Sequence, residues 1–276
     1  MIIYSDLDGT MVGPAGCFFR AADRSITLEP AHALADFLAG AGTLVLVSGR
    51  TRAQLLEASL IFGADGYIAE LGALVGWDRG RSVQALTGAG HPASDALVGQ
   101  LLAAFPGRLE LHEPWHVGHE VDVMLRGNVP AAAASGWLAE AGAGHLELRD
   151  NGVLPLGRPT GLAPDAAPVH VYHLLPRGIS KGAAVRWDLA RRGIPAGQAI
   201  AIGDSVSDLD MAAAVGRFFL VANGAAHVGR TLPANVTVTS AALGLGWAEA
   251  VRAAGAGPGA VRAAADRSQA GRPGGG

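Results

Sequence analysis

The strongest constraint on the fold is a set of short apolar runs that each end in polar or acidic residues. Three of these runs, with the residues that follow them, are 1–4 before Asp6 and Asp8, 43–47 before Ser48, and 199–202 before Gly203 and Asp204. Such runs are typical of buried β-strands. Helical spacing between them predicts a parallel sheet covered by helices. The polar residues then stand at the ends of strands.

Asp6 and Asp8 lie two residues apart at the end of the first run. Residues two apart in a strand point to the same side, so both carboxylates would leave the strand on one side. The turn at Gly9 is expected to give Asp8 a direction of its own. Two carboxylates this close repel each other, and a bound divalent cation offsets the repulsion. Carboxylate and main-chain oxygens suit Mg²⁺. The alternative interpretation is an ordinary Asp-Gly turn after a strand.

Ser48 and Gly49 stand between the second strand and a helix. Thr51 and Gln54 have the spacing of a capping box, so the helix begins directly after Thr51. A hydroxyl and free backbone N–H groups at such a junction can hold a phosphate oxygen. The alternative is a plain strand-to-helix turn.

Lys181 follows Ser180, a suitable N-cap for a helix that runs to Arg192. The helix macrodipole disfavours a cation in the first turn. Lys181 is therefore either a solvated surface residue or a fixed charge that reaches back to a phosphate group. The acidic residues after the run at 199–202 also have two interpretations, because Asp208 or Asp210 could cap the next helix.

Taken in order, these segments resemble the haloacid dehalogenase superfamily. The matching motifs are Asp6-Leu7-Asp8-Gly9-Thr10, Ser48-Gly49, Lys181, and Gly203-Asp204 with Asp208. The resemblance implies an α/β fold with a Rossmann-like parallel sheet core and an inserted α+β cap. It also implies a phosphatase in which Asp6 is the nucleophile and Asp8 is the general acid and base. Phosphate would be held by Ser48, Gly49 and Lys181, and Mg²⁺ by Asp6, Asp8, Asp204 and Asp208.

The second motif indicates which subgroup of the superfamily this chain resembles. Ser48-Gly49-Arg50, the insert that follows, and Lys181-Gly182 are similar to the subgroup with an α/β cap. That subgroup includes sucrose-phosphate, trehalose-phosphate and mannosyl-3-phosphoglycerate phosphatases, and phosphomannomutases. Many of its members carry Asn-Gly-Ala after the third strand, where this chain has Glu70-Leu71-Gly72-Ala73. A polar contact with the substrate is therefore missing there or supplied elsewhere.

The pattern along the chain predicts two domains and a tail. The core is expected to comprise 1–77 and 177–251, with a flap at 11–26. The cap is expected at 78–176, between hinges near 77–80 and 176–179, with helices on one face of a mostly antiparallel sheet. Ala, Gly, Pro and Arg dominate residues 252–276, which predicts a disordered tail.

The cap is expected to select the substrate. Polar candidates across the cap are His116, His119, Glu120, Asp122, Arg126, Arg149, Asp150, Asn151 and His170. Arg126 and Arg149 suit a second anionic group on the substrate. Substrate contacts are predicted for Arg50, Arg126, Arg149, Asn151 and Asn223. Asn223 has two other interpretations, a hydrogen bond to the loop that carries Asp204 or, more simply, the start of a turn with Gly224. A transition-metal site around His116, His119 and Glu120 is disfavoured because its spacing is unspecific.

Three functions fit these features. The first is hydrolysis of a phosphate monoester of a sugar, cyclitol or glycosyl compound through an aspartyl-phosphate. The second is a phosphomutase of the same superfamily, which would release almost no free phosphate. The third is a non-catalytic phospho-accepting switch, which would need neither a cap nor the acid and base at Asp8.

Composition excludes some partners. The formal net charge of −3 favours neither nucleic acid nor an anionic membrane. No apolar run approaches the roughly 20 residues that span a bilayer. The single Cys17 and a first strand that begins at Ile2 predict a cytoplasmic protein without a signal peptide. The expected partner is a small phosphorylated molecule. The oligomeric state is left open.

Overall fold

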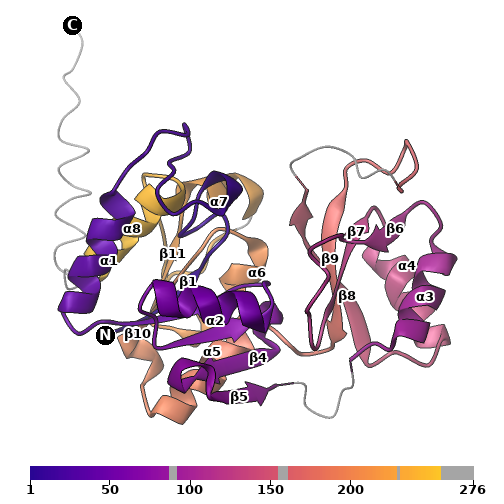
Figure 1. The fold of residues 1–276 in the computed structure, drawn as a ribbon, viewed down its shortest axis with the longest axis horizontal. Helices are drawn as coiled ribbons and strands as arrows, with labels where there is room; N and C mark the ends of the chain where they lie inside the picture. The colour runs from indigo at the N-terminus through magenta and orange to yellow at the C-terminus, as the bar shows by residue number, and fades with distance from the viewer. Residues whose placement is uncertain (87–91, 155–160, 229–230, 256–276) are drawn as a thin grey trace, which may run out of the picture.

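A computed structural model describes residues 1–86, 92–154, 161–228 and 231–255. The chain forms a larger core domain and a smaller cap domain, which lie side by side in Figure 1. The predicted α/β fold class is confirmed, with a mostly parallel central sheet. No helix among the described residues is long and apolar enough to cross a membrane.

An eight-stranded sheet forms the centre of the core domain, in the order β12-β11-β10-β1-β2-β3-β4-β5. Its strands are β1 (Ile2–Asp6), β2 (Thr43–Val47), β3 (Gly66–Ala69), β4 (Leu74–Trp77), β5 (Ser82–Ala85), β10 (Ala199–Gly203), β11 (Arg217–Leu220) and β12 (Val236–Val238). Neighbours from β12 to β3 pair in parallel, and β4 and β5 pair antiparallel at the other edge.

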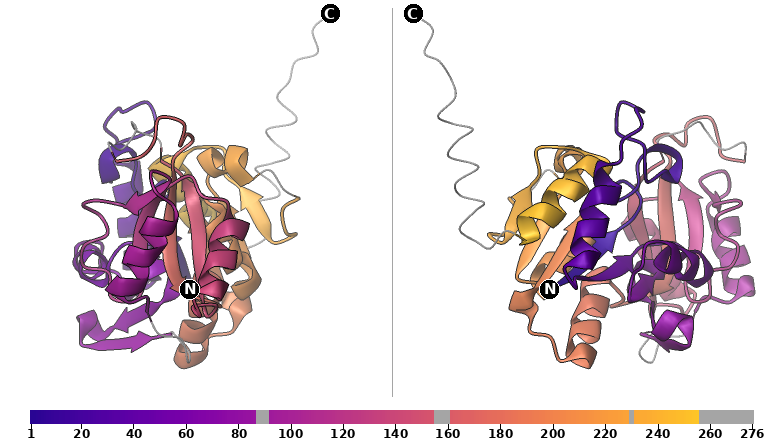
Figure 2. Two further views of the ribbon diagram at one scale, coloured as in Figure 1. Left: turned by 90° about the vertical axis from the view of Figure 1, so that its right-hand side faces the viewer. Right: turned by 60° about the vertical axis from the view of Figure 1, so that its left-hand side comes forward.

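Helices cover both faces of this sheet because its central strands are apolar on both sides. The core helices are α1 (Glu29–Ala39), α2 (Arg52–Ile61), α5 (Lys181–Arg192), α6 (Val206–Leu209), α7 (Ala222–Val228) and α8 (Leu243–Gly255). In β1, Ile3 packs with α1, α2 and α8, whereas Ile2 and Tyr4 pack with α5. Helices α1 and α8 lie side by side in Figure 2.

Short 3-10 turns lie between several of these elements, at Pro14–Gly16, Glu70–Gly72, Asp78–Gly80, Ala196–Gln198 and Asp210–Ala214. The first belongs to the predicted flap. A Cβ at Gly16, where φ is +68°, would lie 3.3 Å from Nη2 of Arg50. The flap therefore passes over the segment that follows β2.

The cap contains a four-stranded antiparallel sheet in the order β6-β7-β9-β8. Its elements are α3 (Asp95–Ala104), β6 (Leu109–Leu111), β7 (Val123–Gly127), α4 (Ala131–Glu140), β8 (Leu146–Val153) and β9 (His170–Pro176). Leu101 and Leu138 bring α3 and α4 onto one face of this sheet, where they pack with Leu125 and Leu174. The other face is turned toward the core domain (Figure 1).

The boundaries of the domains differ from those expected. Strand β5 pairs with β4 in the core sheet, so the turn at 78–80 joins two core strands and is not a hinge. The cap therefore begins later than residue 78. The sequence pattern did not show this because β5 is an exposed edge strand without an apolar run. Helix α8 continues to Gly255, past the expected start of the tail, and residues 256–276 lie outside the described residues.

Strand β8 continues through Asp150, Asn151 and Gly152, residue types that often form turns. The structure has one strand over Leu146–Val153, with an irregularity in its pairing to β9 between Asp150 and Val153. A bulge absorbs the Asp-Asn-Gly sequence without ending the strand.

Candidate active site

The polar ends of the central strands meet at one edge of the core sheet. Asp6 is the last residue of β1, Ser48 follows β2, and Asp204 follows β10. The register pairs Asp6 with Val47, and Ser5 with Ile202. Ser48 and Asp204 therefore each lie one residue beyond the level of Asp6. Asp6 and Ser48 are both buried.

Lys181 supplies a buried positive charge to this edge. Its Nζ lies 2.8 Å from Oδ1 of Asp6 and 2.6 Å from Oδ1 of Asp208. Burial alone would lower the pKa of Lys181, but Asp208 and Asp6 raise it above its ordinary value. Helix α5 can approach this closely because a Cβ at Gly182 would lie only 2.1 Å from the carbonyl oxygen of Asp210. The surface interpretation of Lys181 is therefore wrong.

Asp6, Asp204 and Asp208 form a compact acidic group. One carboxylate oxygen from each lies within 4.8 Å of the others. Burial and the neighbouring Asp208 raise the pKa of Asp6 well above its usual range, and the same two causes raise the pKa of Asp204 to about 7. Lys181 offsets only part of the negative charge. The residues present therefore fit a hard divalent cation, which would complete the charge balance with oxygen ligands.

Asp208 also organises its own loop. Its Oδ2 accepts hydrogen bonds from the backbone N–H groups of Asp204 and Ser205 and from the Ser205 hydroxyl, at 3.0, 2.9 and 2.6 Å. Ser205 and Asp208 form a capping box at the start of α6. The helix-cap interpretation of Asp208 thus holds together with its place in the acidic group.

Asn223 braces the loops of the site. Its side-chain amide donates to the carbonyl oxygen of Gly9 at 2.8 Å and to Oδ2 of Asp204 at 3.3 Å. Its Oδ1 accepts from the backbone N–H of Leu243 at 2.8 Å. Thr10 holds the other Asp204 oxygen through Oγ1 at 3.0 Å. These hydrogen bonds include the one to the loop that carries Asp204, and the substrate contact of Asn223 stays a prediction.

Asp8 is separate from the buried acidic group. Arg50 donates to both of its carboxylate oxygens, from Nε at 2.7 Å and from Nη2 at 2.5 Å. The Asp8 side chain is 52% exposed and that of Arg50 is 33% exposed. The pair therefore stands at the mouth of the site. The predicted contact between the Asp8 main chain and a metal stays a prediction.

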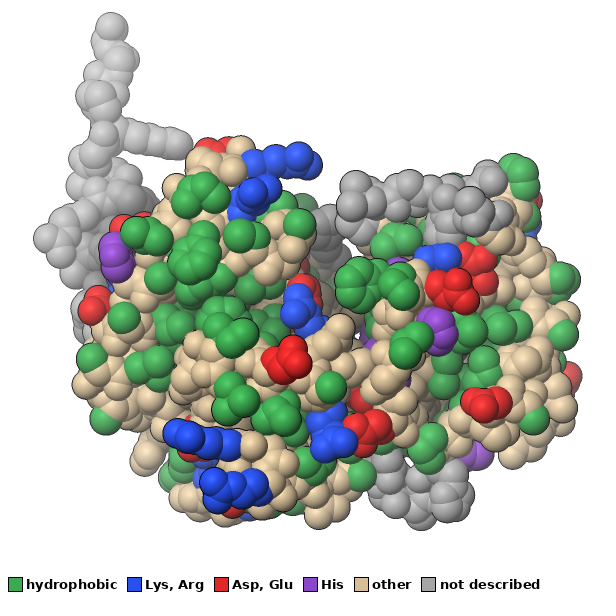
Figure 3. All heavy atoms as spheres, in the orientation of Figure 1, with side chains coloured by type: hydrophobic (Ala, Val, Ile, Leu, Met, Phe, Trp, Pro, Cys, Tyr) green, Lys and Arg blue, Asp and Glu red, His purple; other side chains and the backbone are tan. Residues whose placement is uncertain are grey.

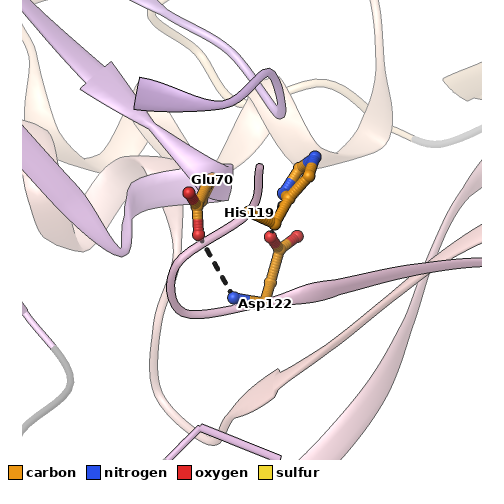
Figure 4. Close-up of side chains that lie close together, drawn as sticks. All are labelled: Glu70, His119 and Asp122. Carbon is orange, nitrogen blue, oxygen red and sulfur yellow. Dashed lines mark hydrogen bonds and ion pairs between the residues drawn. The ribbon is translucent and has the colours of Figure 1, made fainter. Parts of the chain in front are cut away.

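Glu70, in the segment that departs from the subgroup, joins the core to the cap. It follows β3 and is fully buried. Its carboxylate accepts from three consecutive cap N–H groups, those of Glu120, Val121 and Asp122, at 2.8 to 3.2 Å. Figure 4 shows Glu70 facing this turn of the chain. Burial and the nearby Asp122 raise the pKa of Glu70 to about 7.

Asp122 lies in that turn and holds two histidines. Its two carboxylate oxygens are hydrogen-bonded to Nδ1 of His119 and Nδ1 of His173. Burial alone would raise the pKa of Asp122, but the two histidines lower it below its usual range. Glu70, His119 and Asp122 are close enough to share an ion (Figure 4). The carboxylates of Glu70 and Asp122 already have protein donors, so we do not assign a metal to this cluster.

The cap residues predicted to bind substrate have different surroundings. Arg126 pairs with Glu110 at 2.6 Å and Arg149 pairs with Glu147, so both guanidinium groups already have acidic partners. Asn151 reaches the core, where its Oδ1 accepts from Oγ of Ser207 at 3.2 Å.

Charged side chains also gather along the boundary between the two domains in Figure 3. One ion pair that crosses this boundary joins Arg52 of α2 to Glu120 of the cap, at 2.5 Å. Sequence reasoning did not find the roles of Glu70, Thr10 or His173. For His173 a signal existed, because alternation in β9 turns it away from the cap's own core.

Comparisons with known proteins find similarity in part of this sequence. A family model described as haloacid dehalogenase-like hydrolase matches residues 167–242. A phosphoglycolate phosphatase of Halobacterium salinarum is 41% identical over 56 residues, which span 20% of this chain and 25% of that relative.

Solved structures share the fold over nearly the whole chain. A sucrose-phosphatase from Synechocystis, solved with sucrose and phosphate, has a TM-score of 0.65 at 16% identity and covers 92% of this chain and 97% of its own. A haloacid dehalogenase-like hydrolase from Bacteroides thetaiotaomicron has a TM-score of 0.60 at 14% identity, covering 91% and 98%. These matches show that the fold is shared over nearly the whole chain, and the family match at 167–242 agrees with the predicted resemblance to the haloacid dehalogenase superfamily.

Proposed function

We propose that the protein is a Mg²⁺-dependent phosphatase that hydrolyses a phosphate monoester through an aspartyl-phosphate at Asp6. The observation that supports this best is the arrangement of the buried Asp6, Lys181 and Asp208 with the half-buried Asp204 at the ends of β1 and β10. A buried carboxylate with a fixed ammonium beside it is suited to nucleophilic attack on an anionic phosphoryl group. The matched hydrolase family and the phosphatase relative agree with this assignment.

The chemistry needs two steps with different groups. In the first, an oxygen of Asp6 forms a bond to phosphorus while the bond to the leaving oxygen breaks, and Asp8 gives that oxygen a proton. In the second, Asp8 takes a proton from a water molecule, whose oxygen attacks phosphorus and releases Asp6. Arg50 donates one hydrogen bond to each oxygen of Asp8, and the second lone pair of each oxygen is left for the proton that is transferred.

The remaining residues hold the phosphoryl group and the ion. Ser48 and Gly49 follow β2 at the same edge and would bind phosphoryl oxygens through the hydroxyl and backbone N–H groups. Lys181 holds Asp6 in place through its 2.8 Å contact. Mg²⁺ bound by Asp6 and Asp204, with Asp208 beside them, would supply positive charge to the phosphoryl oxygens.

The substrate class is proposed from the cap. Arg126, Arg149 and Asn151 lie on its sheet, and Asn151 reaches the loop that carries Asp208. Polar side chains facing the core suit a hydroxyl-rich or anionic organic group, so we propose a sugar, cyclitol or glycosyl phosphate. The structural neighbour with bound sucrose and phosphate is consistent with this class.

A phosphate-release screen tests the proposal. The purified chain with Mg²⁺ is offered a panel of phosphorylated sugars, cyclitols and glycosyl acids, with p-nitrophenyl phosphate as a small surrogate. We expect steady release of inorganic phosphate from at least one member, and none from Asp6→Asn. Isomerised substrate with almost no free phosphate would indicate a mutase. A stable phosphoprotein without turnover would indicate a switch.

A further inference from the structure

His173 stands on the face of the cap sheet that is turned toward the core. Strand β9 alternates, so Tyr172 and Leu174 pack into the cap's own core, whereas Leu175 packs with the apolar core of the larger domain. His173 shares the side of Leu175 and is fully buried. It therefore lies at the contact between the two domains.

The imidazole of His173 is fixed at one nitrogen. Its Nδ1 is hydrogen-bonded to Oδ2 of Asp122, and because a carboxylate only accepts, Nδ1 carries a proton. Asp122 is fixed in turn, because its backbone N–H donates to the core residue Glu70 at 3.2 Å. The chain of contacts from Glu70 through Asp122 therefore sets the position and the tautomer of His173.

The other ring nitrogen points to the loop proposed to bind phosphate. A Cβ built on Gly49 would lie 3.3 Å from Nε2 of His173 and 3.2 Å from its Cε1. This nitrogen is buried, and it has no hydrogen-bond partner within the part of the chain that the structure describes. A buried polar atom without a partner is costly, and such atoms mark places where a ligand or water completes the structure.

We propose that Nε2 of His173 donates a hydrogen bond to a phosphoryl oxygen of the substrate held on Ser48 and Gly49. The cap then supplies one ligand of the reacting group as well as contacts to the rest of the substrate. With Nδ1 bound to Asp122, a second proton on Nε2 places the imidazolium between a carboxylate and a phosphate. Both of its hydrogen bonds are then charge-assisted. This proposal rests on the proposed function.

Binding of inorganic phosphate in the presence of Mg²⁺ tests the contact without catalysis. We expect His173→Ala to weaken phosphate binding in calorimetry about tenfold or more. His173→Gln, which keeps a neutral donor, is expected to lose less. His145→Ala is the matched control, because His145 is exposed elsewhere on the cap. Wild-type affinity in a folded His173→Ala protein would overturn the proposal.

Imidazole ¹⁵N spectra of the wild-type protein provide a second test that does not depend on a variant folding well. Addition of phosphate should move the Nε2 resonance of His173 toward that of an imidazolium, while Nδ1 stays protonated. The resonance is assigned by its loss in His173→Gln. An Nε2 resonance that does not respond to saturating phosphate would show a purely structural histidine and overturn the proposal.

Kinetics separate this inference from the proposed function. Because every substrate shares the phosphoryl group, His173→Gln should lower kcat/KM by the same factor for the best panel substrate and for p-nitrophenyl phosphate. An active wild-type enzyme whose His173 variants retain full kcat/KM would refute the role of His173 alone. A wild-type protein that hydrolyses none of the panel would refute the proposed function, and the phosphate titrations would still decide on His173.

Discussion

The ammonium group of Lys181 lies 2.8 Å from Oδ1 of Asp6, and both side chains are buried. Lys181 is the only lysine in a chain that otherwise uses arginine for its basic residues. A compact ammonium with three donors fits between Asp6 and Asp208, where the planar fork of a guanidinium does not. The single lysine therefore lies at the position that requires a compact ammonium group.

We expect Lys181→Met to abolish phosphate release and to destabilise the protein by about 3–5 kcal/mol, because it leaves buried carboxylates without a partner. Lys181→Arg should not restore activity, because the larger group does not fit. Urea denaturation and phosphate release measure the two effects. The matched control is Arg186→Met, which removes an exposed charge from the same helix. Near-normal turnover in Lys181→Met would contradict this role.

The acidic group predicts a requirement for a divalent cation. EDTA should remove activity and Mg²⁺ should restore it. Asp204→Asn should raise the Mg²⁺ concentration needed for half-maximal activity at least tenfold, because it removes a charged oxygen ligand from the group around Asp6. Asp210→Asn, in the following turn but outside that group, should leave the Mg²⁺ requirement unchanged. Full activity in chelator, or restoration by zinc alone, would mean that the carboxylates serve another purpose.

The cap arginines should act on the substrate's organic part. We expect Arg149→Ala or Arg126→Ala to raise KM for the best panel substrate, with a much smaller effect on p-nitrophenyl phosphate. One lost charge-assisted hydrogen bond corresponds to a factor of about 10 to 150 in kcat/KM. Arg108→Ala is the control, because Arg108 is also in the cap and its ion pair, with Asp165 at 2.6 Å, involves neither Glu110 nor Glu147. If neither variant altered kcat/KM, specificity would reside in the flap or near Leu71.

Glu70 predicts a pH dependence of stability. Its pKa is raised to about 7 in the folded protein, so between about pH 4.5 and 7 the folded state holds a proton that the unfolded state has lost. Stability therefore falls as the pH rises through this window, by at most about 1.4 kcal/mol per pH unit. Glu70→Gln lacks this contribution. The unfolding free energies of wild type and Glu70→Gln are compared from pH 5 to 7.5 in Mg²⁺. As the pH rises, wild type should lose stability relative to the variant. A difference independent of pH would contradict the assignment.

The sequence predicted the parts of the site that have local signals. Asp6, Ser48 and Asp204 each follow an apolar run, so the parallel sheet alone brings them to one edge. Lys181 could be predicted because a cation is unfavourable in the first turn of a helix unless it has a partner. The α/β fold follows from the same alternation of strands and helices.

The remainder depends on tertiary contacts that leave no local pattern. His173 resembles an ordinary strand residue, and its partner Asp122 is 51 positions away in sequence. The acidic partners of Arg126 and Arg149 come from the surrounding sheet, so the pattern could not show that these side chains are engaged. The sequence pattern did not predict strand β5, because an exposed edge strand needs no apolar run.

The most direct test of the account is to find the phosphoryl group on Asp6. Wild type, Asp6→Asn and Asp8→Asn are mixed with the best panel substrate and Mg²⁺, quenched in acid, and mapped by mass spectrometry of the N-terminal peptide. We expect a transient phosphate on Asp6 in wild type, its accumulation in Asp8→Asn because hydrolysis lacks a base, and none in Asp6→Asn. Phosphate release by Asp6→Asn at the wild-type rate, or turnover without any phosphorylated aspartate, would contradict the account.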